Sequence, residues 1–339
     1  MARSFLLICS LLLLSVLASC RVDDTPPAVA ETLSEVATFD TGKHPLFKIA
    51  DLVRGEDNSL YIVDYQGYTI HKYDTEGRHL AQAHHPTSEK IFEGPVQSMA
   101  FYRNSVYVPE SAKGKAHVFT PNLEYIRTID FAEGLFPFFN MDTDGEEALY
   151  SSSLSHEPEQ KLIHLDAQLR VIRSYDLQEL IGHPLWDVFR SDIDEAGRIV
   201  VAYSFRGIVE IIDPATGTQH SFRLDFGRGK PTAPPKGDYH GRERMIETPR
   251  PQEVFTWDVA VDKEIIYLLG GEFTPNPRRD VYVVDYEGNP LRTLILPAPS
   301  KRIHIDQDYL YTTVDEETGV TKYRLMDTPD LQEEISRHQ

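Results

Sequence analysis

The chain has 339 residues and a formal net charge of −19, and 41% of its residues are hydrophobic, including 17 Tyr and 16 Phe. This apolar content is ample for a folded core, and so acidic a chain argues against nucleic acid and against anionic lipid as partners. With only two cysteines, Cys9 and Cys20, the chain has no disulfide framework, so its stability must come from burial.

The chain begins with a hydrophobic leader. Residues 5–16 are mostly apolar, but a dozen such residues are too few for a lasting transmembrane helix. Leu17, Ala18, Ser19 and Cys20 follow. Apolar segment, small residues and Cys in this order resemble the bacterial lipoprotein signal, in which the Cys is lipidated and becomes N-terminal. The alternative is an ordinary secretory signal with a chance Cys.

This resemblance implies removal of residues 1–19 as a signal peptide and a diacylglycerol and acyl modification at Cys20, which anchors the chain in the cell envelope. The next residue is Arg21. It lacks the acidic character that retains lipoproteins at the inner membrane, so the resemblance implies the outer membrane, on its periplasmic or surface face. Residues 20–33, with Pro26 and Pro27, are expected to form a flexible tether.

A strand pattern then returns about every 45 residues, six times. Each repeat has a first strand, which is expected to line the central channel, then a polar turn, a second and a third strand, and a tight turn that often contains Gly. A fourth strand follows in all repeats but the last. The second strands contain the pairs Leu60-Tyr61, Val106-Tyr107, Leu149-Tyr150, Ile199-Val200, Ile266-Tyr267 and Leu310-Tyr311. Strand repeats of this length predict an all-β fold, a six-bladed β-propeller with one blade per repeat. A seven- or eight-bladed ring would need more strands than the sequence offers.

The sixth repeat lacks a fourth strand, because the chain reaches Pro329 and a polar end. A matching strand pattern lies at residues 34–39, just before the first repeat. We predict that this N-terminal strand completes the last blade and closes the ring, which removes an exposed edge. The propeller is therefore expected to span residues 34–326, followed by a polar tail at 327–339.

These repeats resemble the six-bladed propellers of the NHL-like and TolB-like superfamily, and the leader resembles that of its lipoprotein members. The resemblance covers roughly residues 34 to 326 and implies a fold rather than a chemistry. Enzymes with this fold, such as metal-dependent lactonases and lyases, place several Glu, Asp, Asn or His around a divalent ion at the channel mouth. An enzyme of this type is therefore an alternative for this chain.

Loop lengths indicate which face of the ring carries a site. Turns after the first and third strands are short, whereas the other loops are long, and the longest runs from about 225 to 255. That insertion is either a lid or docking arm for an anionic ligand, or a mobile Pro-rich surface loop. It contains six cations: Arg228, Lys230, Lys236, Arg242, Arg244 and Arg250.

Alignment of the first strands gives one position per blade near the channel entrance: Lys48, Gln97, Phe138, Arg190, Asp258 and Arg302. The cations in this column could hold an anionic small molecule or a peptide carboxylate. Trp257 could offer a stacking face, and Arg206 completes the candidate set. The alternative is that Arg190 or Arg302 pairs with Asp258 and that Trp257 is ordinary packing.

The leading hypothesis is a non-enzymatic, lipid-anchored propeller that needs no cofactor and binds a peptide, glycan or partner protein on its long-loop face. The enzyme alternative would use Asp258, His304 and Asp64 as metal ligands or acid and base groups. Calcium needs six to eight oxygen ligands and zinc three or four strong donors, whereas the aligned column supplies one Asp and no His. The sequence gives no sign of oligomerisation.

Overall fold

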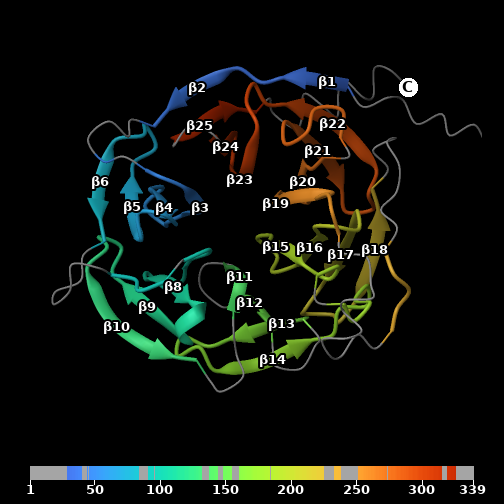
Figure 1. Cartoon of the computed structure of the whole chain (residues 1–339). Helices are drawn as coiled ribbons and strands as arrows, with labels where there is room; N and C mark the ends of the chain where they lie inside the picture. Colours follow the sequence, from blue (N-terminus) through green and yellow to red (C-terminus); the bar gives the residue numbers. More distant parts are fainter. Residues whose placement is uncertain are drawn as a thin grey trace, which may run out of the picture.

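The computed structural model describes residues 29–39, 44, 46–83, 91–94, 96–131, 137–143, 148–154, 160–183, 185–224, 233–237, 251–272, 274–314 and 319–325. These residues form six sheets, which stand as blades around a central channel (Figure 1). The chain is therefore a six-bladed β-propeller, as its repeats predicted. Within the described ranges, no helix is long and apolar enough to cross a membrane.

The strands of each blade run outward from the channel in chain order. Blade one contains β3 (Ile49–Arg54), β4 (Leu60–Asp64), β5 (Thr69–Tyr73) and β6 (His79–Gln82). Blade two contains β7 (Ala100–Phe101), β8 (Val106–Glu110), the short 3-10 helix η1 (Ser111–Lys113), β9 (Lys115–Phe119) and β10 (Tyr125–Asp130). Blade three contains β11 (Pro137–Thr143), β12 (Leu149–Leu154), β13 (Gln160–Leu165) and β14 (Val171–Tyr175).

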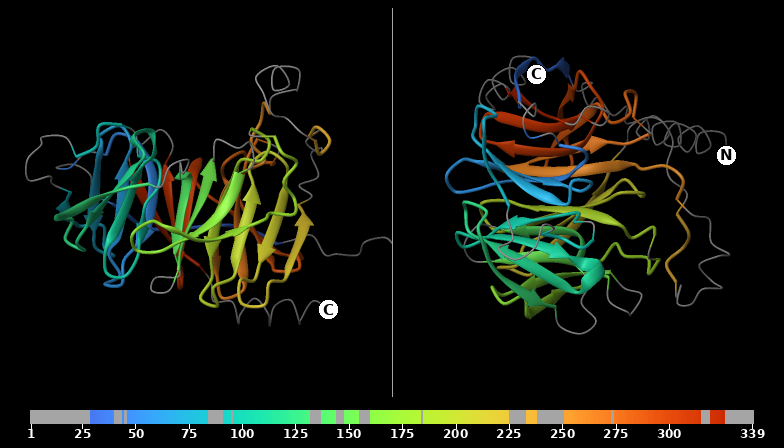
Figure 2. Two further views of the ribbon diagram at one scale, coloured as in Figure 1. Left: turned by 90° about the horizontal axis from the view of Figure 1, so that it is seen from below. Right: turned by 60° about the vertical axis from the view of Figure 1, so that its left-hand side comes forward.

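The remaining blades repeat this order. Blade four contains β15 (Phe189–Ile193), β16 (Ile199–Tyr203), β17 (Ile208–Ile212) and β18 (Gln219–Arg223). Blade five contains β19 (Thr256–Asp262), β20 (Ile265–Gly270), β21 (Asp280–Asp285) and β22 (Pro290–Ile295). Blade six contains β23 (Ser300–Asp306), β24 (Tyr309–Val314) and β25 (Gly319–Arg324). In side view the strands run roughly along the ring axis (Figure 2).

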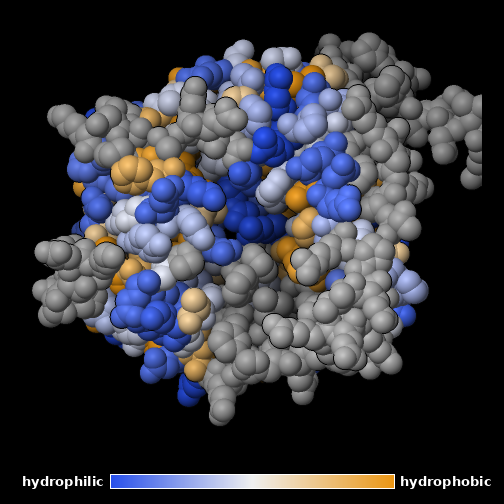
Figure 3. All heavy atoms as spheres, in the orientation of Figure 1, coloured by the Kyte–Doolittle hydropathy of each residue, from blue (hydrophilic) through white to orange (hydrophobic). Residues whose placement is uncertain are grey.

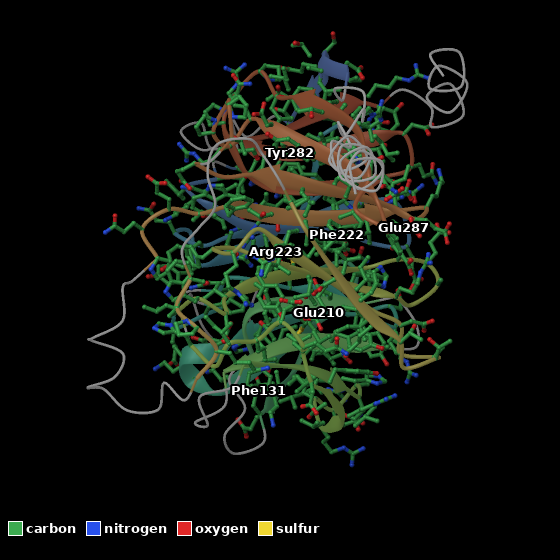
Figure 4. The ribbon with its side chains drawn as sticks, turned by 90° about the vertical axis from the view of Figure 1, so that its right-hand side faces the viewer. Phe131, Glu210, Phe222, Arg223, Tyr282 and Glu287 are labelled. Carbon is green, nitrogen blue, oxygen red and sulfur yellow. The ribbon has the colours of Figure 1, made fainter. Side chains whose placement is uncertain are left out.

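The core lies between neighbouring blades rather than inside any single one. The middle strands are buried on both faces, as every residue of β4 and β16 shows, so they do not alternate apolar and polar residues. The outer strand β6 does alternate, because only one of its faces meets the protein. Phe222 of blade four and Tyr282 of blade five pack against the same core cluster, and both are labelled on the side of the ring in Figure 4.

The ring closes through the N-terminal strand, as predicted. β2 (Glu35–Thr38) pairs antiparallel with β25 as the outermost strand of blade six. The next residue, Phe39, is buried, and its ring lies between Tyr73 of blade one and Tyr311 of blade six. The first and last blades are thereby joined without a free outer edge.

The segment expected to be a flexible tether differs from that expectation at its end. Residues Val29–Thr32 form β1, which pairs in parallel with β22 on the outside of blade five. Two interactions explain its docking: Glu31 pairs with the buried Arg292 at 3.4 Å, and Leu33 packs into the blade-five core. The signal at 1–19 with Cys20, residues 20–28 and the tail at 327–339 lie outside the described residues.

Candidate functional site

A pocket of about 240 Å³ opens at the end of the channel where the first strands begin, and we call it the mouth pocket. Among the described residues, its walls carry four cations and two aromatic rings and no carboxylate. The cations are Lys48, Arg190, Lys301 and Arg302, the rings are Tyr65 and Trp257, and Gln97 completes the polar lining. Figure 3 shows hydrophilic side chains gathered around the hollow at the centre of the ring.

The structure brings five of the candidate residues together in this pocket: Lys48, Gln97, Arg190, Trp257 and Arg302. Asp258 lines a second cavity farther along the channel. The side chain of Phe138 lies outside the described residues, as do all the cations of the long insertion except Lys236.

Arg206 lies elsewhere, in the turn between β16 and β17. Its side chain is buried, and its guanidinium lies 4.0 Å from the ring centroid of Tyr203. It also pairs with Asp187 at 3.2 Å and donates a hydrogen bond to the carbonyl of Glu179. These contacts hold the loops of blade four together, so Arg206 does not line the mouth pocket.

Sequence alignment missed Lys301 and Tyr65. The strand β23 has an irregular register between Ser300 and Ile303, and such bulges re-aim side chains. The consecutive residues Lys301 and Arg302 therefore both line the mouth pocket. The corresponding irregularity in β19 lies between Thr256 and Asp258. The only available signal in the sequence was the adjacency of Lys301 to an aligned position.

The rim lysines lie over aromatic rings. The Nζ of Lys48 is 5.2 Å from the ring centroid of Tyr65, and the Nζ of Lys301 is 5.8 Å from that of Trp257. Cation–π attraction holds an ammonium group in such a position. Burial lowers the pKa of Lys301, and the nearby charges of Arg278 and Lys48 lower it further. The pocket therefore concentrates positive charge that repels itself.

Below the mouth pocket lies a cavity of about 140 Å³, which we call the inner cavity. Arg190 and Arg302 line both spaces and so form the boundary between them. In contrast to the mouth pocket, the inner cavity is rich in carboxylates, one each from blades one, three, four and five. They are Asp51, Asp142, Asp192 and Asp258, and Ser191 and His304 also line this cavity.

These carboxylates link neighbouring blades. Three of them accept a hydrogen bond from a backbone N–H of the first strand, or of the segment leading into it, in the next blade. The bonds join Asp51 to Met99 (3.0 Å), Asp192 to Val261 (2.8 Å) and Asp258 to Ile303 (2.9 Å). Asp142 of blade three accepts a hydrogen bond from the hydroxyl of Ser191 in blade four. The carboxylates that line the inner cavity thus have a structural role, because they link neighbouring blades around the channel.

Burial shifts the protonation of these groups. It raises the pKa of Asp51 to about 6 and that of Asp192 to about 7, and it raises the pKa of Asp258, where the attraction of Arg302 opposes the shift. Burial lowers the pKa of Arg190 to about 9, and the neighbouring charge of Arg302 lowers it further. At neutral pH the guanidinium of Arg190 therefore remains charged, beside a partly protonated Asp192.

Arg302 is fixed in place before any ligand arrives. Its guanidinium lies 3.5 Å from a carboxylate oxygen of Asp258 and donates a hydrogen bond to the carbonyl of Ala50 in blade one. The pairing of Arg302 with Asp258, the alternative interpretation of the aligned column, is thus present. It does not remove Arg302 from the wall of the mouth pocket.

Of the three groups named for the enzyme alternative, Asp258 and His304 line the inner cavity, whereas Asp64 lies elsewhere. Among the described residues, no three His, Cys, Asp or Glu side chains are placed to hold a metal ion. His304 lines the inner cavity, its buried Nε2 has no partner among the described residues, and burial lowers its pKa to about 4. Asp64 instead accepts backbone hydrogen bonds from Phe47 and Lys48 in the loop before β3.

Buried carboxylates anchor other loops on the long-loop face in the same way. Glu110 accepts hydrogen bonds from the N–H groups of Glu93 and Gly94, at 2.7 and 2.6 Å. Glu210, labelled in Figure 4, accepts one from the N–H of Gln178 at 2.7 Å. Part of the acidic composition therefore serves to hold loops rather than to charge the surface.

Comparison with known proteins places the chain by its fold. No family model matches it, and no curated protein sequence matches it. Among solved structures, a member of the DUF4221 family from Bacteroides vulgatus has a TM-score of 0.56 at 15% identity, over 86% of this chain and 97% of that one. The virginiamycin B lyase of Staphylococcus aureus has a TM-score of 0.51 at 9% identity, over 82% and 80%.

The WD40 repeats of RRP9 are similar to the same degree, with a TM-score of 0.53 at 14% identity over 88% of this chain and 99% of that one. The likeness is one of fold alone. At such identities these proteins share an architecture, and the architecture serves both enzymes and binding modules. The function must therefore be argued from the channel itself.

Proposed function

We propose that this protein is a binding module that takes an anionic group of a peptide, glycan or partner protein into the mouth pocket. The observation that carries the proposal is the lining of that pocket, to which the described residues contribute four cations and no carboxylate, in a chain of net charge −19. A local reversal of charge in an acidic protein favours an anionic ligand.

The depth of the pocket supports the same conclusion. The guanidiniums of Arg190 and Arg302 lie at its inner end, where burial strengthens a charge-assisted hydrogen bond. The carboxylates of the inner cavity lie directly beyond them and repel an anion. We therefore expect the anionic group of the ligand to stop at the two arginines.

The test measures, by calorimetry, how tightly matched small probes bind to the protein in detergent. N-acetylglycine and glucuronate are the anionic probes, and N-acetylglycinamide and glucose are their neutral counterparts. We expect the anionic probes to bind at least about tenfold tighter, because one charged hydrogen bond contributes about 1.5–3 kcal/mol. Equal binding of the anionic and neutral probes would contradict the proposal.

A pair of lysine substitutions localises the effect. Lys301→Gln should weaken both anionic probes, since Lys301 lines the mouth pocket. Lys236→Gln is the matched control, because Lys236 is exposed and does not line the pocket. If both variants weaken binding equally, general surface charge rather than the pocket attracts the anion.

We also propose that the propeller is held at the outer membrane through a lipid on Cys20. The support is the order of apolar segment, small residues and Cys at the N-terminus. Mass spectrometry of the mature N-terminus should find an acylated Cys20, and Cys20→Ala should release the protein from the membrane fraction. An unmodified N-terminus on the membrane-bound protein would refute this proposal.

A second candidate function is a metal-dependent lyase- or lactonase-type enzyme. The observation that favours it is the buried Nε2 of His304, which has no hydrogen-bond partner within the described part of the chain and lies in a cavity that also holds Asp258. Elemental analysis of protein purified without chelator decides between the two functions. A stoichiometric divalent ion that is lost in His304→Gln would favour the enzyme, and its absence would count against it.

A further inference from the structure

Two aromatic side chains of blade one are exposed on the segments that also carry the mouth-pocket residues Lys48 and Tyr65. Phe47 is 56% exposed and Tyr68 is 41% exposed, and we call them the aromatic strip. Among the described residues, the other large apolar side chains exposed to this extent are aliphatic. They are Val36, Leu80, Ile126, Val171 and Ile172 on outer strands and Leu185 in a loop of blade four.

Hydrogen bonds fix the aromatic strip to the rim of the pocket. The carboxylate of Asp64 accepts the N–H of Phe47 at 2.9 Å and that of Gly67 at 2.9 Å. The N–H of Tyr65 donates to the carbonyl of Lys48 at 2.8 Å. Phe47 is therefore one residue from the pocket cation Lys48, and Tyr68 follows in the turn that carries the pocket ring Tyr65.

The backbone at Tyr68 is strained. Its φ is +53°, in the left-handed region that a bulky residue rarely adopts. The corresponding turn of blade four, between β16 and β17, has Gly207 at this position with φ +60°. A glycine would therefore relieve the turn of blade one. An exposed, strained aromatic residue beside a pocket suggests a role in binding.

We propose that the aromatic strip docks the apolar side chains of an extended peptide whose C-terminal carboxylate lies in the mouth pocket on Arg190 and Arg302. This inference rests on the proposed function and specifies that the anionic group is the C-terminal carboxylate of a peptide. The aromatic faces inside the pocket favour a peptide over a glycan. A lysine ammonium group lies over one face of the ring of Tyr65 and of Trp257, where it competes with the stacking of a sugar ring.

The pocket dimensions agree with a terminal residue. A volume of about 240 Å³ accommodates one carboxylate with a small side chain, and the guanidiniums supply the bidentate geometry that carboxylates prefer. Residues upstream of the end must leave through the mouth. On the blade-one side we expect them to meet Phe47 and Tyr68, because aromatic anchors often dominate the energy of an interface.

The test uses calorimetry with the lipidated protein in detergent and three peptide probes. The first is a short peptide containing leucine and phenylalanine with a free carboxylate, the second is its C-terminal amide, and the third is pentaglycine with a free carboxylate. We expect the first probe to bind at least about tenfold tighter than each of the others. Equal binding of the amide would overturn the assignment of the carboxylate.

Substitutions separate this inference from the proposed function. Phe47→Ala should remove the advantage of the apolar peptide and leave pentaglycine binding unchanged. Leu80→Ala is the matched control, because Leu80 is 54% exposed on the outer strand of the same blade. If pentaglycine binds but Phe47→Ala changes nothing, only this inference fails. If pentaglycine, N-acetylglycine and glucuronate all fail to bind, the proposed function fails with it.

Tyr68→Gly gives an independent readout. It should weaken the apolar peptide as Phe47→Ala does, while the urea midpoint stays equal or rises, because the strained turn is relieved. A lower midpoint would show that Tyr68 is there to stabilise the fold and would overturn the argument from strain. Tighter binding of an oligogalacturonate than of the peptide would likewise overturn the choice of a peptide.

Discussion

Phe39 is the side chain through which the N-terminal strand closes the ring, and Phe39→Ala tests that closure. Phe39 is 2% exposed, and its ring centroid lies 5.5 Å from that of Tyr73 and 6.2 Å from that of Tyr311. Its N–H also donates to the carbonyl of Val320 at 3.0 Å. Since the ring contacts blades one and six, its removal leaves a cavity in the closing joint. We expect the free energy of unfolding to fall by about 3–5 kcal/mol.

The assay is urea-induced unfolding at neutral pH, followed by tryptophan fluorescence. Val36→Ala is the matched control on the same strand, because Val36 is 53% exposed and its truncation should change the free energy by less than about 0.5 kcal/mol. A loss in Phe39→Ala within about 1 kcal/mol of that control would refute the reasoning. It would show that the closing strand is not held by its buried residue.

Three further outcomes follow from the same structure. Gly77→Ala should cost about 1–3 kcal/mol in urea unfolding, because φ is +79° and a Cβ would lie 3.0 Å from the Cα of Phe39; a neutral effect would contradict this. Burial lowers the pKa of His71 to about 4, so the unfolded chain binds the proton first as the pH drops. The free energy of unfolding should therefore fall by about 3 kcal/mol between about pH 6.5 and pH 4. His71→Gln should lose this pH dependence, and an unchanged pH dependence would rule out His71 as its source. Burial raises the pKa of Asp192 to about 7, so its ionised form destabilises the fold by about 4 kcal/mol at higher pH, and stability is regained as pH falls from about 7 toward 4. Asp192→Asn cannot ionise and should lack that gain, as unfolding at several pH values would show; a gain equal to that of the wild type would contradict the assignment.

The architecture was predictable from the sequence because it depends on local residue patterns. Pairs such as Leu60-Tyr61 recur with turn residues between them, and this periodicity needs no knowledge of distant contacts. The closing strand was also predictable, because the sixth repeat lacked a fourth strand and residues 34–39 could supply one. The aligned column was useful for the site because the first strands of all blades face one channel.

The errors arose where side-chain direction depends on more than strand alternation. The irregular register of β23 places Lys301 and Arg302 in one pocket, although consecutive strand residues normally face opposite ways. Arg206 has the same charge as Arg190, yet its partner Asp187 lies in another loop, so only the folded chain shows that it is buried. β1 forms because blade five offers a buried arginine that Glu31 can neutralise.

By itself, the sequence determined the number of blades, their order and the way the ring closes, because these depend on repeated short-range propensities. Only the tertiary structure decided which charges meet. It gathers cations of blades one, four and six at the mouth and carboxylates of blades one, three, four and five below them. Electrostatic energy depends on distance and burial. Neither quantity can be read from the chain until its blades surround a common axis.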